Sequence, residues 1–400
     1  MITVAPRESS GSGVAWASRR VIIAGAAAVA LAAAGTATAL AALHSGANGH
    51  AGTAKAKLAA VSCTGPAGAA YVALPGYQAF DAVNTANCDL VQQYNVGDGL
   101  VPNTGTQDFN YDSSEEGVAL SGDTLYFADT GNDTVAVINA ADLNPDNYAL
   151  PPETLIHVGF DPQGLAVTPD GSQVWIADTG PQTGQPSLGG ISVLSTASDT
   201  VTSTLNLPAD PREIVFSPSG ATAYVTTGDG LLVINTATLK VAAVIPGLGN
   251  PEDAVVSPDG QTVYVTNTVQ GVVDVISAAT NRVTGTIKVG QMPWQLALSS
   301  DGGTLYVADG DSNAISVIAV KSGTVTDTIS DAGNPVSLAL TPDGSQLWVG
   351  GLTSGIVTVF KTADDSLVGS FNVGYGGEAN AGDGEEPTGI VLTSIPTPGG

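Results

Sequence analysis

The sequence has few basic residues for its length. Its 400 residues include 11 Lys and Arg against 37 Asp and Glu, which gives a formal net charge of −26. Five of the basic residues and one acidic residue lie within residues 1–57, which leaves 6 basic and 36 acidic residues, a net charge of −30, for the remainder. A surface of this sign repels phosphate backbones, so we expect no nucleic-acid partner.

Histidine and cysteine are scarcer still, and this limits the chemistry that the chain can perform. The three histidines are His44, His50 and His157, and the two cysteines are Cys63 and Cys88. We find no Ser-His-Asp set, zinc cluster or haem ligand pair in the sequence. The sequence therefore favours a binding protein over an enzyme.

Residues 1–57 have the features of an export signal. An uncharged, Ala-rich run of 23 residues (21–43) follows Arg19 and Arg20, which resembles a twin-arginine signal. Residues 37–39 and 54–56 are candidate A-x-A cleavage sites. The alternative is an uncleaved anchor, since a run of this length can span a bilayer. In both cases we expect the rest of the chain to be secreted or at the cell surface, with membrane attachment only through this segment.

Glycine and proline are abundant, and they recur between short β-branched runs. One unit reads PEDAVVSPDGQTVYVTN over residues 251–267, and related copies begin at Pro162, Pro211, Pro293 and Pro335. Each contains a Pro-Asp-Gly type turn, and two further strand-like runs follow it. Four-stranded units repeated at this spacing predict a β-propeller.

Each unit has an aromatic residue in its second strand, so the units can be counted by this residue. The aromatic positions are Tyr126, Trp175, Tyr224, Tyr264, Tyr306 and Trp348. Residues 71–74, 80–84 and 89–96 look like the last three strands of a seventh unit, and residues 387–392 look like its first strand. We predict an all-β, seven-bladed β-propeller over residues 58–396, with a closure blade shared by the N- and C-terminal strands and a tail at 397–400. Closure would remove open sheet edges; six blades with a decorated N-terminus is the alternative.

The segment Tyr264-Val265-Thr266-Asn267 spells the signature for which the YVTN β-propeller repeat family is named, and residues 224–227 nearly repeat it. Over about residues 69–393 the chain resembles this family of bacterial, exported propellers, which has lactonase-like, surface-layer and nucleic-acid-associated relatives. The resemblance implies the fold and leaves the function open. On this fold Cys63 and Cys88 both fall on the bottom face of the closure blade, where an exported chain is expected to join them in a disulfide.

We expect a ligand-binding funnel on the top face, which is formed by the loops that enter the first strands and those that join the second and third strands. Its predicted residues are Glu116, Gln163, Arg212, Glu213, Glu252, Asp253, Trp294 and Gln295. Three interpretations of these acid-rich loops stay open. The acids cap turns; or they bind a cation such as Ca²⁺; or Arg212 and Trp294 hold an anionic or sugar-like ligand.

The candidate calcium ligands are Asp309, Asp311 and Asn313, although this segment departs from the EF-hand pattern at Ala314 and Val320. Three long top-face insertions, 97–117, 180–190 and 375–386, are further candidates for function. We therefore expect an extracytoplasmic propeller that binds an extracellular protein, a glycan such as a cell-wall polymer, or a small molecule, with no cofactor other than Ca²⁺. A lactonase-like hydrolase that uses the same funnel is the alternative.

Overall fold

The structure is a computed structural model. Contacts divide the chain into two units, Met1–Leu58 and Ala59–Gly400, and all residues described here belong to the second. They are residues 69–74, 79–84, 89–95, 117–143, 154–180, 189–228, 230–331, 333–352, 355–373 and 389–393. The predicted export signal, Cys63, Cys88, Glu116 and most of the three long insertions lie outside these ranges. Within them, no helix is long and apolar enough to cross a membrane.

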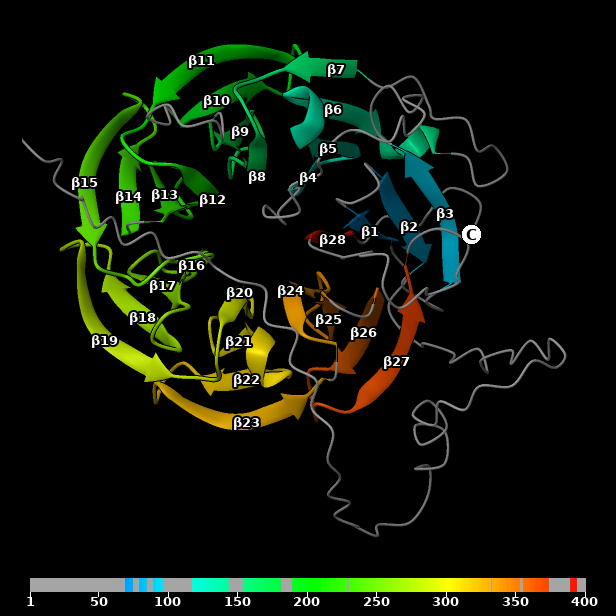
Figure 1. Ribbon diagram of the computed structural model, residues 1–400, viewed down its shortest axis with the longest axis vertical. Helices are drawn as coiled ribbons and strands as arrows, with labels where there is room; N and C mark the ends of the chain where they lie inside the picture. The colour runs from blue at the N-terminus through cyan, green and yellow to red at the C-terminus, as the bar shows by residue number, and fades with distance from the viewer. Residues whose placement is uncertain are drawn as a thin grey trace, which may run out of the picture. The chain divides into compact units, whose positions relative to one another are not determined.

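The described strands form seven four-stranded antiparallel sheets arranged as blades around a central axis (Figure 1). The first three blades are β4 (Val118–Ser121), β5 (Thr124–Asp129), β6 (Thr134–Asn139) and β7 (Thr154–His157); β8 (Pro162–Val167), β9 (Gln173–Asp178), β10 (Gly190–Ser195) and β11 (Thr200–Asn206); and β12 (Pro211–Phe216), β13 (Thr222–Thr227), β14 (Gly230–Asn235) and β15 (Lys240–Pro246). The next three are β16 (Ala254–Val256), β17 (Thr262–Asn267), β18 (Val272–Ser277) and β19 (Arg282–Lys288); β20 (Pro293–Leu298), β21 (Thr304–Asp309), β22 (Ala314–Ala319) and β23 (Thr324–Ser330); and β24 (Pro335–Leu340), β25 (Gln346–Gly351), β26 (Ile356–Lys361) and β27 (Leu367–Asn372).

The seventh sheet joins the two ends of the propeller, and it confirms the predicted closure. Its order is β28 (Gly389–Thr393), β1 (Ala69–Leu74), β2 (Ala79–Asn84) and β3 (Asp89–Asn95). Strand β28 pairs antiparallel with β1, with Ala73 opposite Gly389 and Ala69 opposite Thr393. The all-β, seven-bladed fold expected from the repeats is therefore confirmed.

The turn between the first and second strands forms as its sequence predicts. In the blade that begins with β16, Gly260 adopts a φ of 69°, and its N–H donates to the Ser257 carbonyl at 2.8 Å. Asp259 Oδ1 accepts from Ser257 Oγ at 2.6 Å and from the Gln261 N–H at 3.0 Å. Glycine supplies the positive φ and aspartate satisfies the turn amides, which is why this short sequence recurs in the blades.

The core lies between neighbouring blades. Trp175 on β9 is fully buried and packs against Ile214 and Ala223 of the following blade. Its ring meets that of Phe216 edge-on, with centroids 5.3 Å apart. Because the apolar side chains of each second strand contact the neighbouring blade, burial fixes the blades against one another and sets the positions of the innermost strands.

Candidate functional site

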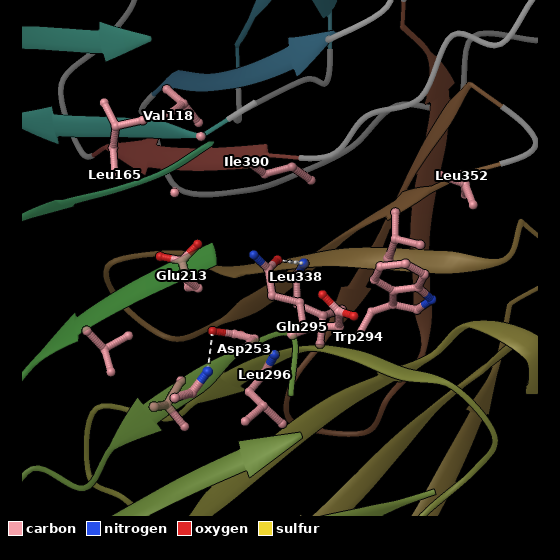
Figure 2. Close-up of a pocket in the computed structure, with 17 residues that line it drawn as sticks. Val118, Leu165, Glu213, Asp253, Trp294, Gln295, Leu296, Leu338, Leu352 and Ile390 are labelled. Atoms are coloured by element: carbon pink, nitrogen blue, oxygen red, sulfur yellow. Dashed lines mark hydrogen bonds between the residues drawn. The ribbon is translucent and has the colours of Figure 1, made fainter. Parts of the chain in front are cut away.

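The innermost strands of all seven blades contribute to one cavity of about 220 Å³ (Figure 2). Its lining residues are Gly117, Val118, Gly164, Leu165, Glu213, Val215, Glu252, Asp253, Ala254, Val255, Trp294, Gln295, Leu296, Val336, Leu338, Leu352 and Ile390. Many of them stand at the beginning of a first strand, and Leu352 follows β25. The cavity therefore lies at the face where the first strands begin, which is the predicted top face of the propeller.

The polar side chains of the cavity wall are confined to three consecutive blades, which also contribute Val215, Ala254, Val255 and Leu296. The polar side chains come from three consecutive blades: Glu213 from the blade of β12, Glu252 and Asp253 from that of β16, and Trp294 and Gln295 from that of β20. The other four blades contribute glycine and aliphatic residues, namely Gly117, Val118, Gly164, Leu165, Val336, Leu338, Leu352 and Ile390. Figure 2 shows Val118, Leu165 and Ile390 on the side of the cavity opposite Asp253. A cavity with this division suits an amphipathic molecule.

Two glycines allow the innermost strands to approach closely on the apolar side. A Cβ atom on Gly117 would lie 2.4 Å from the Gln163 carbonyl oxygen, and one on Gly164 would lie 2.2 Å from the Arg212 carbonyl oxygen. The Gly117 N–H donates to that Gln163 oxygen at 2.9 Å. Only glycine fits at such distances, so these residues set the width of the cavity between β4, β8 and β12.

Asp253 occupies the repeat position of Gly164 in the blade of β16, and its side chain connects two blades. Its Oδ1 accepts from the Ala254 N–H at 2.6 Å, and its Oδ2 accepts from the Leu296 N–H of the next blade at 2.7 Å. The residue is only 8% exposed. Burial raises the pKa of Asp253 above its usual range, against the lowering effect of the two amide hydrogen bonds, and the nearby Glu252 charge raises it further.

Gln295 makes a similar connection to the following blade, because its Oε1 accepts from the Leu338 N–H at 2.6 Å. Glu213 Oε1 accepts from the N–H of Ile214 in its own strand at 3.1 Å. These three side chains stand at the same position of the repeat, two residues after its first proline. Their oxygens thus satisfy backbone amides along the inner edges of the first strands.

Arg212 and Glu252 form an ion pair between adjacent blades. Arg212 Nη1 donates to Glu252 Oε1, and Asn250 Nδ2 donates to the same oxygen at 2.6 Å. The side chains of Arg212 and Glu252 are 28% and 10% exposed. The guanidinium is therefore held by a carboxylate, which weakens the interpretation in which Arg212 receives an anionic ligand.

Trp294 lines the cavity and packs against the backbone of the 3₁₀ turn η5 (Gly310–Ser312). A Cβ atom on Gly310 would lie 2.7 Å from the indole Cδ1 and 2.8 Å from Nε1. The indole is partly buried against the core cluster that contains Ala297 and Leu338. Gly310 is thus required for this orientation of the indole.

The acids that end several second strands turn into the protein. Asp129, Asp178 and Asp309 are 2%, 5% and 1% exposed. Asp178 accepts from Ser192 Oγ at 2.6 Å and from the Gly159 N–H at 3.1 Å, and Asp309 accepts from Ser316 Oγ at 2.5 Å. Burial raises the pKa of Asp178 to about 7 and that of Asp309 to about 6, although these hydrogen bonds lower it. These acids connect the second and third strands, in agreement with the turn-capping interpretation.

The other predicted calcium ligands lie near Asp309 in sequence. Asp311 is exposed, and Asn313 Oδ1 accepts from the Asn334 N–H at 3.1 Å. Among the described residues, no group of three or more His, Cys, Asp or Glu side chains is placed to hold a metal ion. The calcium site stays a prediction.

The structure brings together most of the predicted funnel residues. Glu213, Glu252, Asp253, Trp294 and Gln295 line the cavity, and Arg212 is joined to it through Glu252. Gln163 is buried and does not line it, although its backbone carbonyl accepts from Gly117. Sequence reasoning missed the apolar wall. Its signal is Gly117, Gly164 and Gly389, which stand at the repeat position that holds Glu213, Asp253 and Gln295 in other blades.

Comparisons with known proteins support this architecture. The family model described as "Lactonase, 7-bladed beta-propeller" matches residues 194–338. Over these residues the chain is similar to lactonase-type seven-bladed propellers. No curated protein matches the chain.

Solved structures resemble this chain at the level of the fold. A functionally unknown protein from Desulfotomaculum acetoxidans DSM 771 is 15% identical, with a TM-score of 0.62 over 82% of this chain and 99% of that one. Hydrazine synthase from Kuenenia stuttgartiensis is 19% identical, with a TM-score of 0.56 over 71% of this chain and 91% of that one. Identities this low carry the fold and no activity.

Proposed function

We propose that this chain is an exported propeller that binds a small amphipathic ligand in its top-face cavity. The observation that carries the proposal is the division of the cavity wall, with polar groups from three consecutive blades facing aliphatic groups from the other four. A few polar groups in a mostly apolar concavity are typical of small-molecule sites, because the apolar wall supplies affinity and the polar groups fix orientation.

The size of the cavity restricts the ligand. Its volume of about 220 Å³ is below the roughly 300 Å³ at which drug-sized sites begin. A folded protein partner or a long polymer would reach it only with one terminal group. A free small molecule is therefore the favoured ligand, ahead of the extracellular protein and the cell-wall polymer.

Binding in the cavity is tested with a panel of small neutral alcohols, amides and lactones, measured by calorimetry and by tryptophan fluorescence, to which Trp294 contributes. We expect at least one member to bind, and Val118→Phe to abolish its binding, because the larger ring occupies the apolar half. Asp327→Asn changes an exposed residue of β23 outside the cavity and serves as the control. Binding that survives Val118→Phe, or a panel without any binder, would contradict the proposal.

The extracytoplasmic location rests on residues 1–57 alone. We expect Arg19→Lys and Arg20→Lys together to retain the protein in the cytoplasm, because the twin-arginine route reads the arginine pair. Cell fractionation in a host with that route measures the outcome. Unchanged export of the double variant would contradict the twin-arginine assignment.

Lactone hydrolysis is the second candidate function. The family match over residues 194–338 contains Glu213, Glu252, Asp253 and Gln295, which is most of the polar half of the cavity. A carboxylate such as that of Glu213 can act as a general base for the attack of water on a lactone carbonyl. The test is the acid release from lactones at constant pH, with and without Ca²⁺; hydrolysis that disappears in Glu213→Gln would favour the enzyme over the binding protein.

A further inference from the structure

We propose that the ligand of the cavity is an organic cation, an ammonium group carried on a small apolar body. This inference rests on the proposed function and specifies the chemical class of the ligand. It depends on the charge of the polar half, on its hydrogen-bonding groups and on the position of Trp294.

The charge of the cavity wall favours a cation over an anion. Glu213, Glu252 and Asp253 line the cavity, and among its described lining residues there is no Lys, Arg or His. Among its described residues the wall therefore carries three acidic side chains and no basic one, and Arg212 beside it pairs with Glu252. An anion would meet these acids in a site of low dielectric, where repulsion between like charges is strong.

The hydrogen-bonding groups of the wall favour a ligand that donates. The oxygens of Asp253, Glu213 and Gln295 accept from backbone amides, and each oxygen has a second lone pair for a ligand. The side-chain donors on the wall are the Gln295 amide and the indole N–H of Trp294. A polyhydroxylated sugar carries several hydroxyls that need both kinds of partner, and the aliphatic wall would leave part of them unpaired. An ammonium group with an apolar body matches both halves of the cavity.

Trp294 adds an aromatic surface on the polar side. Its indole is fixed against Gly310, so the ring does not have to be ordered when a ligand binds. An ammonium group near an indole is attracted by the negative electrostatic potential of the ring face. In Figure 2 Trp294 and Glu213 stand on different sides of the cavity, so the ammonium group of a ligand can lie at the indole or at the Glu213 carboxylate, with the apolar body extending toward the other.

The net charge of the whole chain also favours a cationic ligand. Its formal net charge of −26 creates a field that raises the local concentration of cations near the surface and increases their rate of association. The cavity and the surface thus favour the same sign of ligand. The surface field is screened by salt, whereas contacts inside the cavity are screened much less.

Three molecules of nearly the same shape provide the test. Choline is the cationic probe, 3,3-dimethyl-1-butanol is its neutral counterpart, and 3,3-dimethylbutanoate is an anion of similar size. Calorimetric titration of the full-length protein at moderate salt should show choline binding about tenfold or more tightly than the alcohol, a difference of ~1.4 kcal/mol. The anion should bind most weakly.

Two variants assign the preference to the cavity. Glu213→Gln keeps the shape and removes one charge, so it should reduce the preference for choline over the alcohol to about threefold or less. Trp294→Leu should weaken choline binding more than alcohol binding. Asp327→Asn removes an exposed charge on β23, the fourth strand of its blade and outside the cavity, and should retain the full preference. Circular dichroism checks that each variant is folded.

The outcomes separate this inference from the proposed function. Suppose that the alcohol binds, that Val118→Phe abolishes its binding, and that choline binds no more tightly than the alcohol. This result would overturn the inference that the ligand is a cation, and the cavity would still be a binding site. Tighter binding of the anion, absence of choline binding, or an equal preference in Glu213→Gln would also overturn the cation. Failure of the wider neutral panel is the result that counts against the cavity itself.

Discussion

The close approach of β8 and β12 predicts that Gly164→Ala destabilises the propeller. The new Cβ would lie 2.2 Å from the Arg212 carbonyl oxygen and 2.9 Å from Glu213 Oε2, whereas ordinary contacts begin at 3.4 Å. One strand must therefore move by about 1.2 Å, the difference between 3.4 and 2.2 Å. The nearest atom is backbone, so a side-chain rotation cannot relieve the contact, and packing on both sides resists the shift. Overpacking of this kind costs about 1–3 kcal/mol.

Equilibrium unfolding in urea, followed by circular dichroism, measures the loss of stability caused by Gly164→Ala. The matched control is Gly228→Ala, because a Cβ on Gly228 meets no atom within 4 Å. We expect the control to unfold at the urea concentration of the wild type or slightly above it, since alanine restricts the unfolded chain. Equal midpoints for Gly164→Ala and the wild type would refute the view that glycine is needed to bring β8 and β12 together.

Three further predictions follow from the buried polar groups. The folded-state pKa values of Asp178 and Asp309, about 7 and about 6, lie above their unfolded values, so the stability they contribute is complete below about pH 4 and is lost as the pH rises to about 7. Thermal unfolding between pH 4.5 and 8 should show this fall, and Asp178→Asn with Asp309→Asn should flatten it; an unchanged slope would disprove the assignment. Ser316→Ala should raise the pKa of Asp309 further in an NMR titration, because the serine hydroxyl lowers it; a fall would contradict the hydrogen bond. Gln295→Leu leaves the Leu338 N–H without its acceptor and should cost about 1–3 kcal/mol in urea unfolding, whereas Gln295→Glu, which retains an oxygen, should cost less; equal losses would argue against the bond.

The fold could be predicted from the sequence because its signals are local and repeated. Each Pro-Asp-Gly turn defines its own hairpin, and the aromatic residue two positions into each second strand marks a buried face. The closure strand at Gly389–Thr393 was found because its apolar pattern matches the other first strands. Because the unit recurs along the chain, its pattern of strands and turns can be compared between several copies.

The candidate site was predicted only in part, because it depends on contacts between blades. The positions of Glu213, Asp253 and Gln295 follow from the repeat. The pairing of Arg212 with Glu252 joins residues 40 positions apart and has no local sequence signal. The orientation of Asp178 towards Ser192 could not be predicted from the local sequence either. Gly117 and Gly164 stand at the repeat position that holds Glu213, Asp253 and Gln295 in three other blades, which is the signal that would have revealed the narrow side of the cavity.

The pairing of β28 with β1 also determines when the protein can become stable during synthesis. Among the described strands β1 is made first and β28 last, and they are neighbours in one sheet. Until β28 leaves the ribosome, β1 has an open edge and the cavity lacks the wall supplied by Ile390. The ring therefore closes only after residues 389–393 have been translated, so a nascent chain stopped before residue 389 would expose a strand edge that can pair with another chain.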